Sequence, residues 1–112
     1  MYCRSCRKWF PNNILFCDIC GKPLVKDLDI YGENFFNGDV QAFDYIYQNS
    51  YNWVAGEVRK MFSANSSEVE DCVQEIYLLL YRKIKYYDPR QGSFSAWFNA
   101  LVRNRIYDYG RK

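Results

Sequence analysis

The stretch SSEVEDCVQEIYLLLYRKIKYYDPRQGSFSAWFNALVRNRIYDYGRK, residues 66–112, decides the fold of this 112-residue chain. It predicts two helices joined by a short loop that is rich in basic and aromatic residues. The first helix is expected to begin at Ser67, because Ser67 and Glu70 have the spacing of a capping box. Pro89 and Gly92 are expected to end this helix and shape the turn. Ser93 is expected to cap the second helix, which runs to about Asp108.

Apolar residues recur at helical spacing along both segments, which predicts that each helix buries one face. The stripe of the first helix comprises Val69, Cys72, Val73, Ile76, Leu79, Leu80 and Ile84. The stripe of the second comprises Phe94, Trp97, Phe98, Leu101 and Val102. Cys72 is expected to pack in the core, because a free cysteine behaves as a small hydrophobic residue.

Together the two segments closely resemble region 2 of bacterial sigma-70-type initiation factors, particularly the extracytoplasmic-function group. In the first helix the matching residues are Asp71, Val73, Gln74, Glu75, Tyr77, Leu78 and Tyr81. In the loop and second helix they are Asp88, Pro89, Arg90, Gly92, Ser93, Phe94, Trp97, Arg103, Asn104 and Asp108. Residues 38–62 extend the resemblance more weakly.

The resemblance implies docking on core RNA polymerase. In the family, the acidic first helix lies against the basic coiled coil at the clamp of the largest subunit. The corresponding residues here are Asp71, Gln74, Glu75 and Leu78. A polar rim around an exposed leucine is suited to such a contact. The alternative is that these side chains simply face solvent.

The resemblance also implies recognition and melting of the promoter minus-10 element. In the family, the loop holds a flipped base, and the following helix tracks the non-template single strand. Capture of single-stranded bases offsets the cost of unstacking them. The candidate DNA-binding residues are Lys83, Lys85, Tyr86, Tyr87, Arg90, Gln91, Ser93, Asn99, Arg103, Asn104 and Arg105. The alternative for Asp88 and Ser93 is capping, and for Phe94 and Trp97 it is core packing.

Charge is unevenly distributed along the chain, although the net charge is only +2. Residues 82–112 hold eight Lys or Arg against two acids, whereas residues 26–81 hold three against ten. The basic end suits phosphate and the acidic middle suits a basic protein, although two solvated faces without a partner would look the same. No apolar run reaches the length of a membrane span, and the first ten residues lack the apolar region of a signal peptide, so we expect a cytoplasmic protein.

The first 25 residues contain two CxxC motifs, Cys3–Cys6 and Cys17–Cys20. Such turns each aim two thiolates at one tetrahedral ion, and we expect a small zinc-ribbon β-hairpin to join them around one structural zinc ion. Disulfides and a redox dithiol are the alternatives, and the expected cytosolic location disfavours disulfides. Four cysteines leave no coordination position for a catalytic water.

The remaining segments complete a mainly α fold with three domain assignments: a zinc ribbon at 1–25, a linker at 26–37 and a helical region 2-like domain at 38–112. Asp39 is expected to start a helix that breaks at Asn49–Ser50, after which a second helical pattern continues. Three to four helices then surround a predicted core of Phe43, Tyr47, Val54, Val58, Cys72, Ile76, Leu79, Leu80, Trp97 and Leu101.

The leading interpretation is therefore a sigma factor domain, a binding module without a residue set for catalysis. An anti-sigma factor is a further candidate partner. Two other classes stay open, a zinc-ribbon adaptor that binds protein and a metal or redox sensor. A complete factor of this group also has region 4 for the minus-35 element, which this sequence lacks. Either the domain is excised, or another chain supplies that function.

Overall fold

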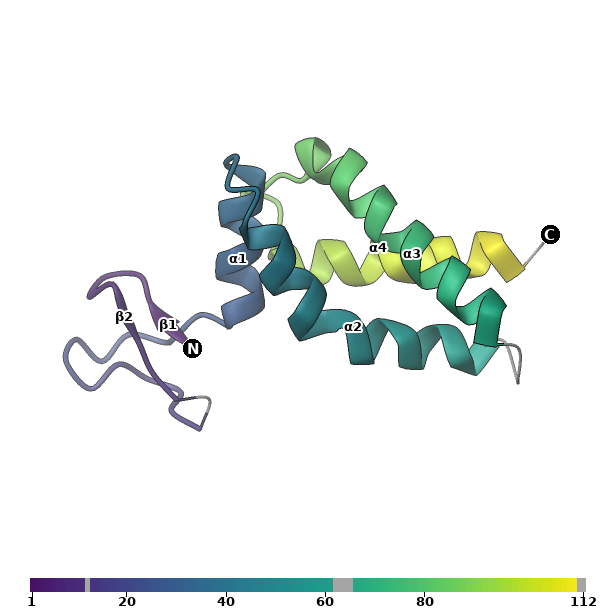
Figure 1. The fold of residues 1–112 in the computed structure, drawn as a ribbon. Coiled ribbons are helices and arrows are strands. Elements are labelled where there is room, and N and C mark those ends of the chain that lie inside the picture. Colours follow the sequence, from purple (N-terminus) through teal and green to yellow (C-terminus); the bar gives the residue numbers. More distant parts are fainter. Residues whose placement is uncertain (12, 62–65, 111–112) are drawn as a thin grey trace.

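The computed structural model describes residues 1–11, 13–61 and 66–110. Figure 1 shows a small ribbon at one end of the molecule and a body of helices beside it. The ribbon carries two short strands, β1 (Tyr2–Cys3) and β2 (Lys8–Trp9). The body comprises α1 (Asp27–Phe36), α2 (Ala42–Met61), α3 (Ser66–Lys83), the short 3₁₀ helix η1 (Ile84–Tyr86) and α4 (Phe94–Gly110). The chain is thus mainly α with a two-stranded antiparallel sheet, as the sequence predicts.

The hairpin of the ribbon encloses the first CxxC turn instead of joining the two turns. Strands β1 and β2 pair antiparallel, with Tyr2 opposite Trp9, so that Cys6 lies in the turn between them. A separate bridge between Phe16 and Pro23 flanks the second CxxC turn. The expected position of the hairpin is therefore wrong, because each pair of cysteines has its own tight turn.

Helix α1 lies where the sequence analysis expects a linker. Residues 27–36 are helical, and Phe35 joins the buried core of the body. Asp27 and Asp29 lie in the first turn, where carboxylates interact favourably with the helix dipole. The linker assignment for 26–37 is thus wrong at the level of local structure, and Figure 1 shows α1 standing between the ribbon and the other helices.

Helix α2 continues without interruption through Asn49–Ser50, where a break was expected. Ser50 is buried at 2% exposure. Its hydroxyl lies in hydrogen-bond contact with the Ile46 carbonyl one turn earlier and, at 2.7 Å, with the Tyr77 hydroxyl of α3. The polar side chain is satisfied inside the helix pair, so it does not need to leave the helix.

Helices α3 and α4 confirm the two helices of the deciding stretch. Helix α3 begins at Ser66, one residue before the predicted start, and α4 extends two residues beyond Asp108. The stripe residues Val69, Cys72, Val73, Ile76 and Leu80 are buried, as are Phe94, Phe98, Leu101 and Val102.

The core lies between α2, α3 and α4, with α1 closing one end. Most predicted core residues are buried there, but Leu79 is only half-buried and three aromatics are not buried. Phe43 and Trp97 are half-buried, and Tyr47 is exposed at 37%. These rings line hollows at the surface and are described below. Within the described residues, no helix is long and apolar enough to cross a membrane.

Candidate functional site

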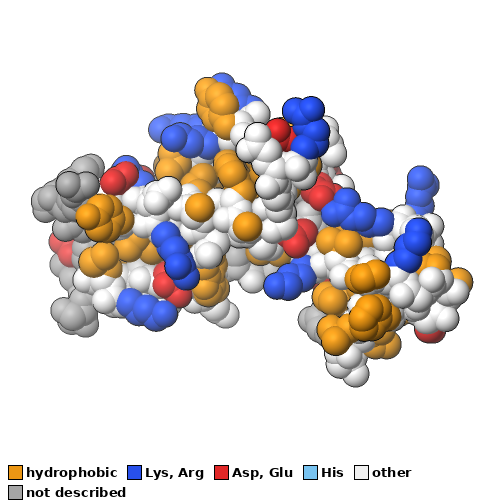
Figure 2. Space-filling view, turned by 180° about the vertical axis from the view of Figure 1, so that it is seen from behind, with side chains coloured by type: hydrophobic (Ala, Val, Ile, Leu, Met, Phe, Trp, Pro, Cys, Tyr) orange, Lys and Arg blue, Asp and Glu red, His pale blue; other side chains and the backbone are white. Residues whose placement is uncertain are grey.

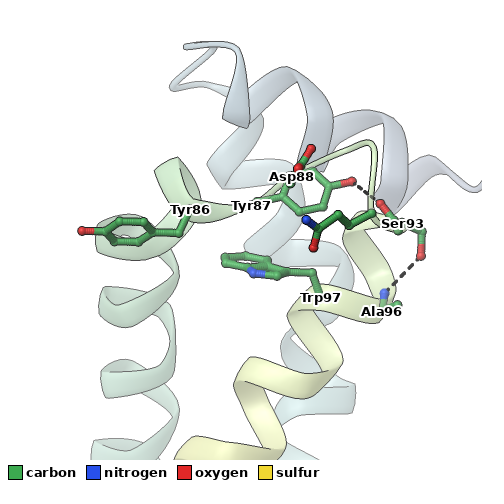
Figure 3. Close-up of a pocket in the computed structure, with 8 residues that line it drawn as sticks. Tyr86, Tyr87, Asp88, Ser93, Ala96 and Trp97 are labelled. Carbon is green, nitrogen blue, oxygen red and sulfur yellow. Dashed lines mark hydrogen bonds between the residues drawn. The ribbon is translucent and has the colours of Figure 1, made fainter.

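A hollow of about 440 Å³ opens beneath the loop between η1 and α4. The loop contributes one wall, and the first turn of α4 contributes the other. Figure 3 shows the Trp97 ring reaching from α4 under the loop, with the Tyr86 ring on the other side of the opening from Ser93. The lining residues are Tyr86, Tyr87, Asp88, Gln91, Gly92, Ser93, Ala96 and Trp97. This hollow, called the loop pocket below, combines aromatic rings with hydrogen-bonding groups.

Three of the loop residues form hydrogen bonds within the loop or with the first turn of α4. Tyr87 is only 3% exposed, and its hydroxyl donates a hydrogen bond of 3.0 Å to the Gly92 carbonyl. Burial raises the pKa of Tyr87. Asp88 accepts a hydrogen bond from the Arg90 amide, and Ser93 accepts one from the Ala96 amide. Capping therefore accounts for Asp88 and Ser93, and Tyr87 lies in the wall of the pocket without an exposed ring face for stacking.

Other residues of the loop have side chains that reach solvent. Tyr86 is 70% exposed, and the Lys85 ammonium lies 5.2 Å from the centre of its ring. Gln91 is exposed at the pocket. Arg90 is highly exposed and forms an ion pair with Asp88 at 3.2 Å, which lowers the pKa of Asp88. Tyr86 and Gln91 thus line the pocket with exposed side chains.

Trp97 is the pocket residue that the sequence analysis assigned to the core. It is half-buried and lines the loop pocket on one side. On its other side it lines a second hollow of about 540 Å³ between α3 and α4. The helical spacing of Phe94 and Trp97 predicts that both are buried, and this is correct for Phe94. Trp97 lies at the edge of the apolar stripe, where a large ring can be partly exposed.

The second hollow gathers four of the predicted DNA-binding residues, Lys83, Tyr86, Asn104 and Arg105. Arg105 forms an ion pair with Glu75 of α3. Both were predicted to bind partners, Glu75 the polymerase and Arg105 a phosphate, and in this structure they bind each other. Arg105 is thus partly neutralised by Glu75, and Lys83 is the main source of positive charge at this hollow.

The remaining two predicted DNA-binding residues lie elsewhere on α4. Arg103 lines a separate hollow of about 270 Å³ against the end of α2, with Glu57 and Lys60. Asn99 is half-buried, and its Oδ1 atom has no hydrogen-bond partner among the described residues. The structure thus does not bring all the predicted DNA-binding residues to one surface.

The predicted polymerase-binding residues share one face of α3. Asp71, Gln74 and Leu78 are exposed, with Leu78 at 56%. Beside them lies an apolar groove of about 470 Å³ between α2 and α3. It is lined by Phe43, Tyr47, Gln74, Tyr77, Leu78 and Tyr81. The contribution of Phe43 and Tyr47 to this groove was not predicted, because their helical spacing indicated burial alone.

The four ribbon cysteines converge as predicted. All four sulfurs lie within 4.8 Å of one another, with Cys3 and Cys20 at 3.6 Å and Cys6 and Cys17 at 3.7 Å. Four sulfurs bound tetrahedrally to zinc at 2.3 Å would be separated by about 3.8 Å, whereas sulfurs in a disulfide are about 2.05 Å apart. The cluster is compatible with a metal site.

Local backbone geometry shapes the two turns alike. Arg7 and Gly21 each follow the second cysteine of a CxxC motif, and both have positive φ values, 54° and 74°. Their amides donate hydrogen bonds to the carbonyls of Cys3 and Cys17. Arg7 therefore adopts the left-handed conformation that glycine has in the other turn.

The sulfur cluster also perturbs the thiols. A hydrogen bond with Cys17 and burial raise the pKa of Cys6 to about 12, and the Cys20 backbone amide is the main cause that lowers the pKa of Cys17 to about 7. A thiolate is the form that binds a metal ion. By contrast, burial raises the pKa of Cys72 in the core, as expected for a packing role.

Comparison with known proteins adds independent evidence. The family model described as Sigma-70 region 2 matches residues 46–112. The chain is 33% identical over 85 residues to the ECF RNA polymerase sigma factor SigK of Mycobacterium sp. (strain KMS), covering 76% of this chain and 44% of that protein. It is 31% identical over 74 residues to the ECF RNA polymerase sigma factor RpoE of Cereibacter sphaeroides, covering 66% and 40% respectively. No solved structure matches the chain.

Proposed function

The chain belongs to the sigma-70 region 2 family, with extracytoplasmic-function sigma factors as relatives, and from this premise we propose that it docks on core RNA polymerase and captures unpaired bases of a promoter minus-10 element. The chain spans less than half the length of these relatives. The cytoplasm, where polymerase works, is the proposed location.

The loop pocket is the observation that carries the proposal. Its volume of about 440 Å³ falls in the range of small-ligand pockets. Trp97 and Tyr86 offer ring faces, and Gln91 offers an amide that can donate to and accept from the edge of a base. Stacking on aromatic rings stabilises single-stranded bases by about 1–3 kcal/mol each, which is comparable with the cost of unstacking a base from a duplex.

The second hollow would receive the strand that continues from the captured base. It shares Tyr86 and Trp97 with the loop pocket, so the two hollows form one path along α4. Lys83 and Asn104 lie along this path, where an ammonium suits a phosphate and an amide suits a base or a sugar. Arg103 and Asn99 lie outside the path and are assigned no contact with this strand.

Polymerase docking uses the exposed face of α3 and the apolar groove beside it. Leu78 and Tyr81 supply apolar area, and Asp71 and Gln74 form a polar rim. Apolar centres with polar rims are typical of protein interfaces. The negative charge of Asp71 fits the basic coiled coil that the resemblance implies, and charge complementarity speeds such association.

One zinc ion bound by Cys3, Cys6, Cys17 and Cys20 holds the ribbon together. The sulfur separations fit tetrahedral coordination and leave no position for a catalytic water. The domain is therefore proposed to be a binding module and not an enzyme. We assign residues 1–25 to the ribbon and include α1 in the helical body, and an anti-sigma factor stays a candidate regulator.

Base capture is tested with a single-stranded oligonucleotide of minus-10 sequence that carries 2-aminopurine at the flipped position. Binding of the base in the loop pocket should change its fluorescence, and Gln91→Ala and Trp97→Ala should weaken that binding. Lys60→Ala, on the exposed end of α2, is the matched control. Equal affinity for the intact probe and for a probe lacking the base would reject the proposal.

Polymerase docking is tested by binding of the purified chain to core RNA polymerase at low salt. Gln74→Ala combined with Leu78→Ala should weaken binding, because both line the groove edge. Glu75 is left intact in this variant because it is paired with Arg105. Glu68→Gln, exposed on the same helix, is the control, and undiminished binding of the double variant would contradict the assignment of this face.

A further inference from the structure

Helix α1 makes an unexpected contact with the loop pocket. It precedes residues 46–112, which match the family model, so the match does not account for it. We infer that Asp29 of α1 is a positioning residue for the loop pocket, because it holds the first turn of α4 through Ser95. The inference rests on the proposed function, since it assigns Asp29 to the same base-binding pocket.

The Asp29 carboxylate supplies a cap that the sequence around α4 does not provide. Its Oδ1 atom accepts hydrogen bonds from the Ser95 amide at 2.7 Å and from the Ser95 hydroxyl at 2.6 Å. The first amides of a helix have no partner within the helix. Ser93 satisfies the Ala96 amide, and Asp29 satisfies the Ser95 amide beside it. A carboxylate at this position also interacts favourably with the helix dipole.

The turn that Asp29 caps is the turn that lines the pocket. Ser93, Ala96 and Trp97 are pocket residues, and Ser95 lies between them in the sequence. If the first turn of α4 frayed, the Trp97 ring and the Ser93 hydroxyl would lose their fixed positions. Asp29 does not line the pocket, so its effect must pass through this turn.

Close packing fixes α1 against the same turn. Gly32, one turn after Asp29, lies so near the Phe94 ring that a Cβ atom would overlap it. Phe36, on the same face of α1, packs edge-on against Tyr87, with ring centres 5.6 Å apart. Tyr87 in turn packs edge-on against Phe94. Residues at positions 29, 32 and 36 of α1 thus contact the helix turn and the loop on both sides of the pocket.

The ribbon supports α1 from another side. Arg4 forms an ion pair of 2.6 Å with Glu33, and Trp9 stacks on Tyr31 with ring centres 5.6 Å apart. Tyr31 continues the stack onto Tyr45 of α2. Helix α1 therefore lies between the ribbon and the loop pocket, and its position is fixed by contacts with both.

The experiment uses the full chain and the 2-aminopurine oligonucleotide, with an abasic oligonucleotide as its partner probe. Asp29→Ala should weaken binding of the base-containing probe about fivefold, as expected for loss of a helix cap, and leave abasic binding unchanged. Asp29→Asn keeps an acceptor and should restore most of the affinity, because asparagine caps helices as well as aspartate. Asn34→Ala, exposed on the same helix, is the control.

Amide hydrogen exchange separates local positioning from general instability. In Asp29→Ala the Ser95 amide should exchange faster, while amides in the middle of α2 and α3 keep their protection. Ser95→Ala, which removes only the hydroxyl donor, should have a smaller effect on base binding than Asp29→Ala.

The outcomes distinguish this inference from the proposed function. If the wild-type chain does not discriminate between the base-containing and abasic probes, the proposed function fails. If the wild-type chain discriminates and Asp29→Ala does so equally well, the inference about Asp29 is overturned. Equal weakening of both probes, or failure of Asp29→Asn to restore affinity, would also overturn it.

Discussion

The ribbon and the helical body reach a defined structure by different physical means. The buried cluster of the ribbon consists of Cys3, Cys17 and Leu24, and two of these are metal-ligand candidates. The body buries a continuous core of aliphatic and aromatic side chains from all four helices. A segment as short as the ribbon cannot bury enough apolar surface to fold without a metal or crosslinks. Metal binding should thus decide the structure of one region and leave the other largely unaffected.

The two regions also present different surfaces. Leu15, Phe16 and Ile19 of the ribbon are each more than half exposed. Figure 2 shows hydrophobic side chains gathered on the ribbon lobe, with Lys and Arg side chains both there and over the helical body. The body, in contrast, places the exposed rings of Tyr47, Tyr81 and Tyr86 beside hollows. The comparison between the regions can be tested by perturbing each one alone and then the contacts between them.

The largest effect is expected from removing one of the four candidate metal ligands. Cys17→Ser should abolish stoichiometric zinc binding, because apparent binding energies of structural zinc sites, about 10–16 kcal/mol, depend on all ligands. Zinc content reports on the ribbon, and far-ultraviolet circular dichroism reports on the helical body. Cys72→Ser is the control for cysteine chemistry, since Cys72 lies in the core away from the cluster. Retention of one zinc per chain would contradict the assignment of Cys17 as a ligand. Unfolding of the helices together with zinc loss would contradict the independence of the two regions.

A smaller but still large effect is expected from a cavity in the body. Phe98 is 1% exposed, and Phe98→Ala should lower the free energy of unfolding by about 3–5 kcal/mol. Urea denaturation followed by circular dichroism measures it. The exposed Val40 provides the control, because Val40→Ala should change stability by less than about 0.5 kcal/mol. The ribbon should keep its zinc in Phe98→Ala, and zinc loss at native conditions would contradict the independence of the two regions.

The contact between the ribbon and the helical body should contribute less to stability than the packing inside either region. Trp9 packs on Tyr2 and Tyr31, and Trp9→Ala should lower the unfolding free energy of the body by about 1 kcal/mol, as aromatic pairs typically contribute. Phe16→Ala, at an aromatic of the ribbon that is more than half exposed, is the matched control. Equal effects of the two substitutions would show that the stack does not join the regions.

The smallest effect is expected for the ion pair between Arg4 and Glu33. Both side chains are partly exposed, so solvent screens their attraction. A double-mutant cycle of Arg4→Ala and Glu33→Ala should give a coupling of less than about 1 kcal/mol. The coupling should shrink further as salt is raised. A larger coupling, or one insensitive to salt, would mean that this pair is more important than the aromatic stack.

The sequence was sufficient for elements whose pattern is local. The stripes of α3 and α4 recur at helical spacing, and the four cysteines are paired at metal-binding spacing, so both were predicted. Helix α1 was missed because the acidic composition and two glycines of residues 26–38 indicated a linker, whereas its position is fixed by packing against α2 and α4. The break at Ser50 was wrongly expected because its partner, Tyr77, lies 27 residues away.

The candidate site shows the same division between local and distant information. The loop motif led to the expectation of a base-holding pocket, with capping as the alternative for Asp88 and Ser93. It could not show that Tyr87 turns inward, because this depends on Phe36, or that Arg105 is already paired with Glu75. Asp29 was not considered, because its partner Ser95 is 66 residues away and no spacing rule connects them.

The ion pair between Glu75 and Arg105 has a thermodynamic consequence. It joins the face of α3 to the hollow along α4, and the Arg105 side chain is only 22% exposed. Any ligand that draws Glu75 away leaves a half-buried guanidinium without its counter-charge, and a phosphate is well suited to replace it. Binding at the two faces is then linked through a shared charge. By reciprocity, whatever free energy one partner gains from the presence of the other, the other gains equally.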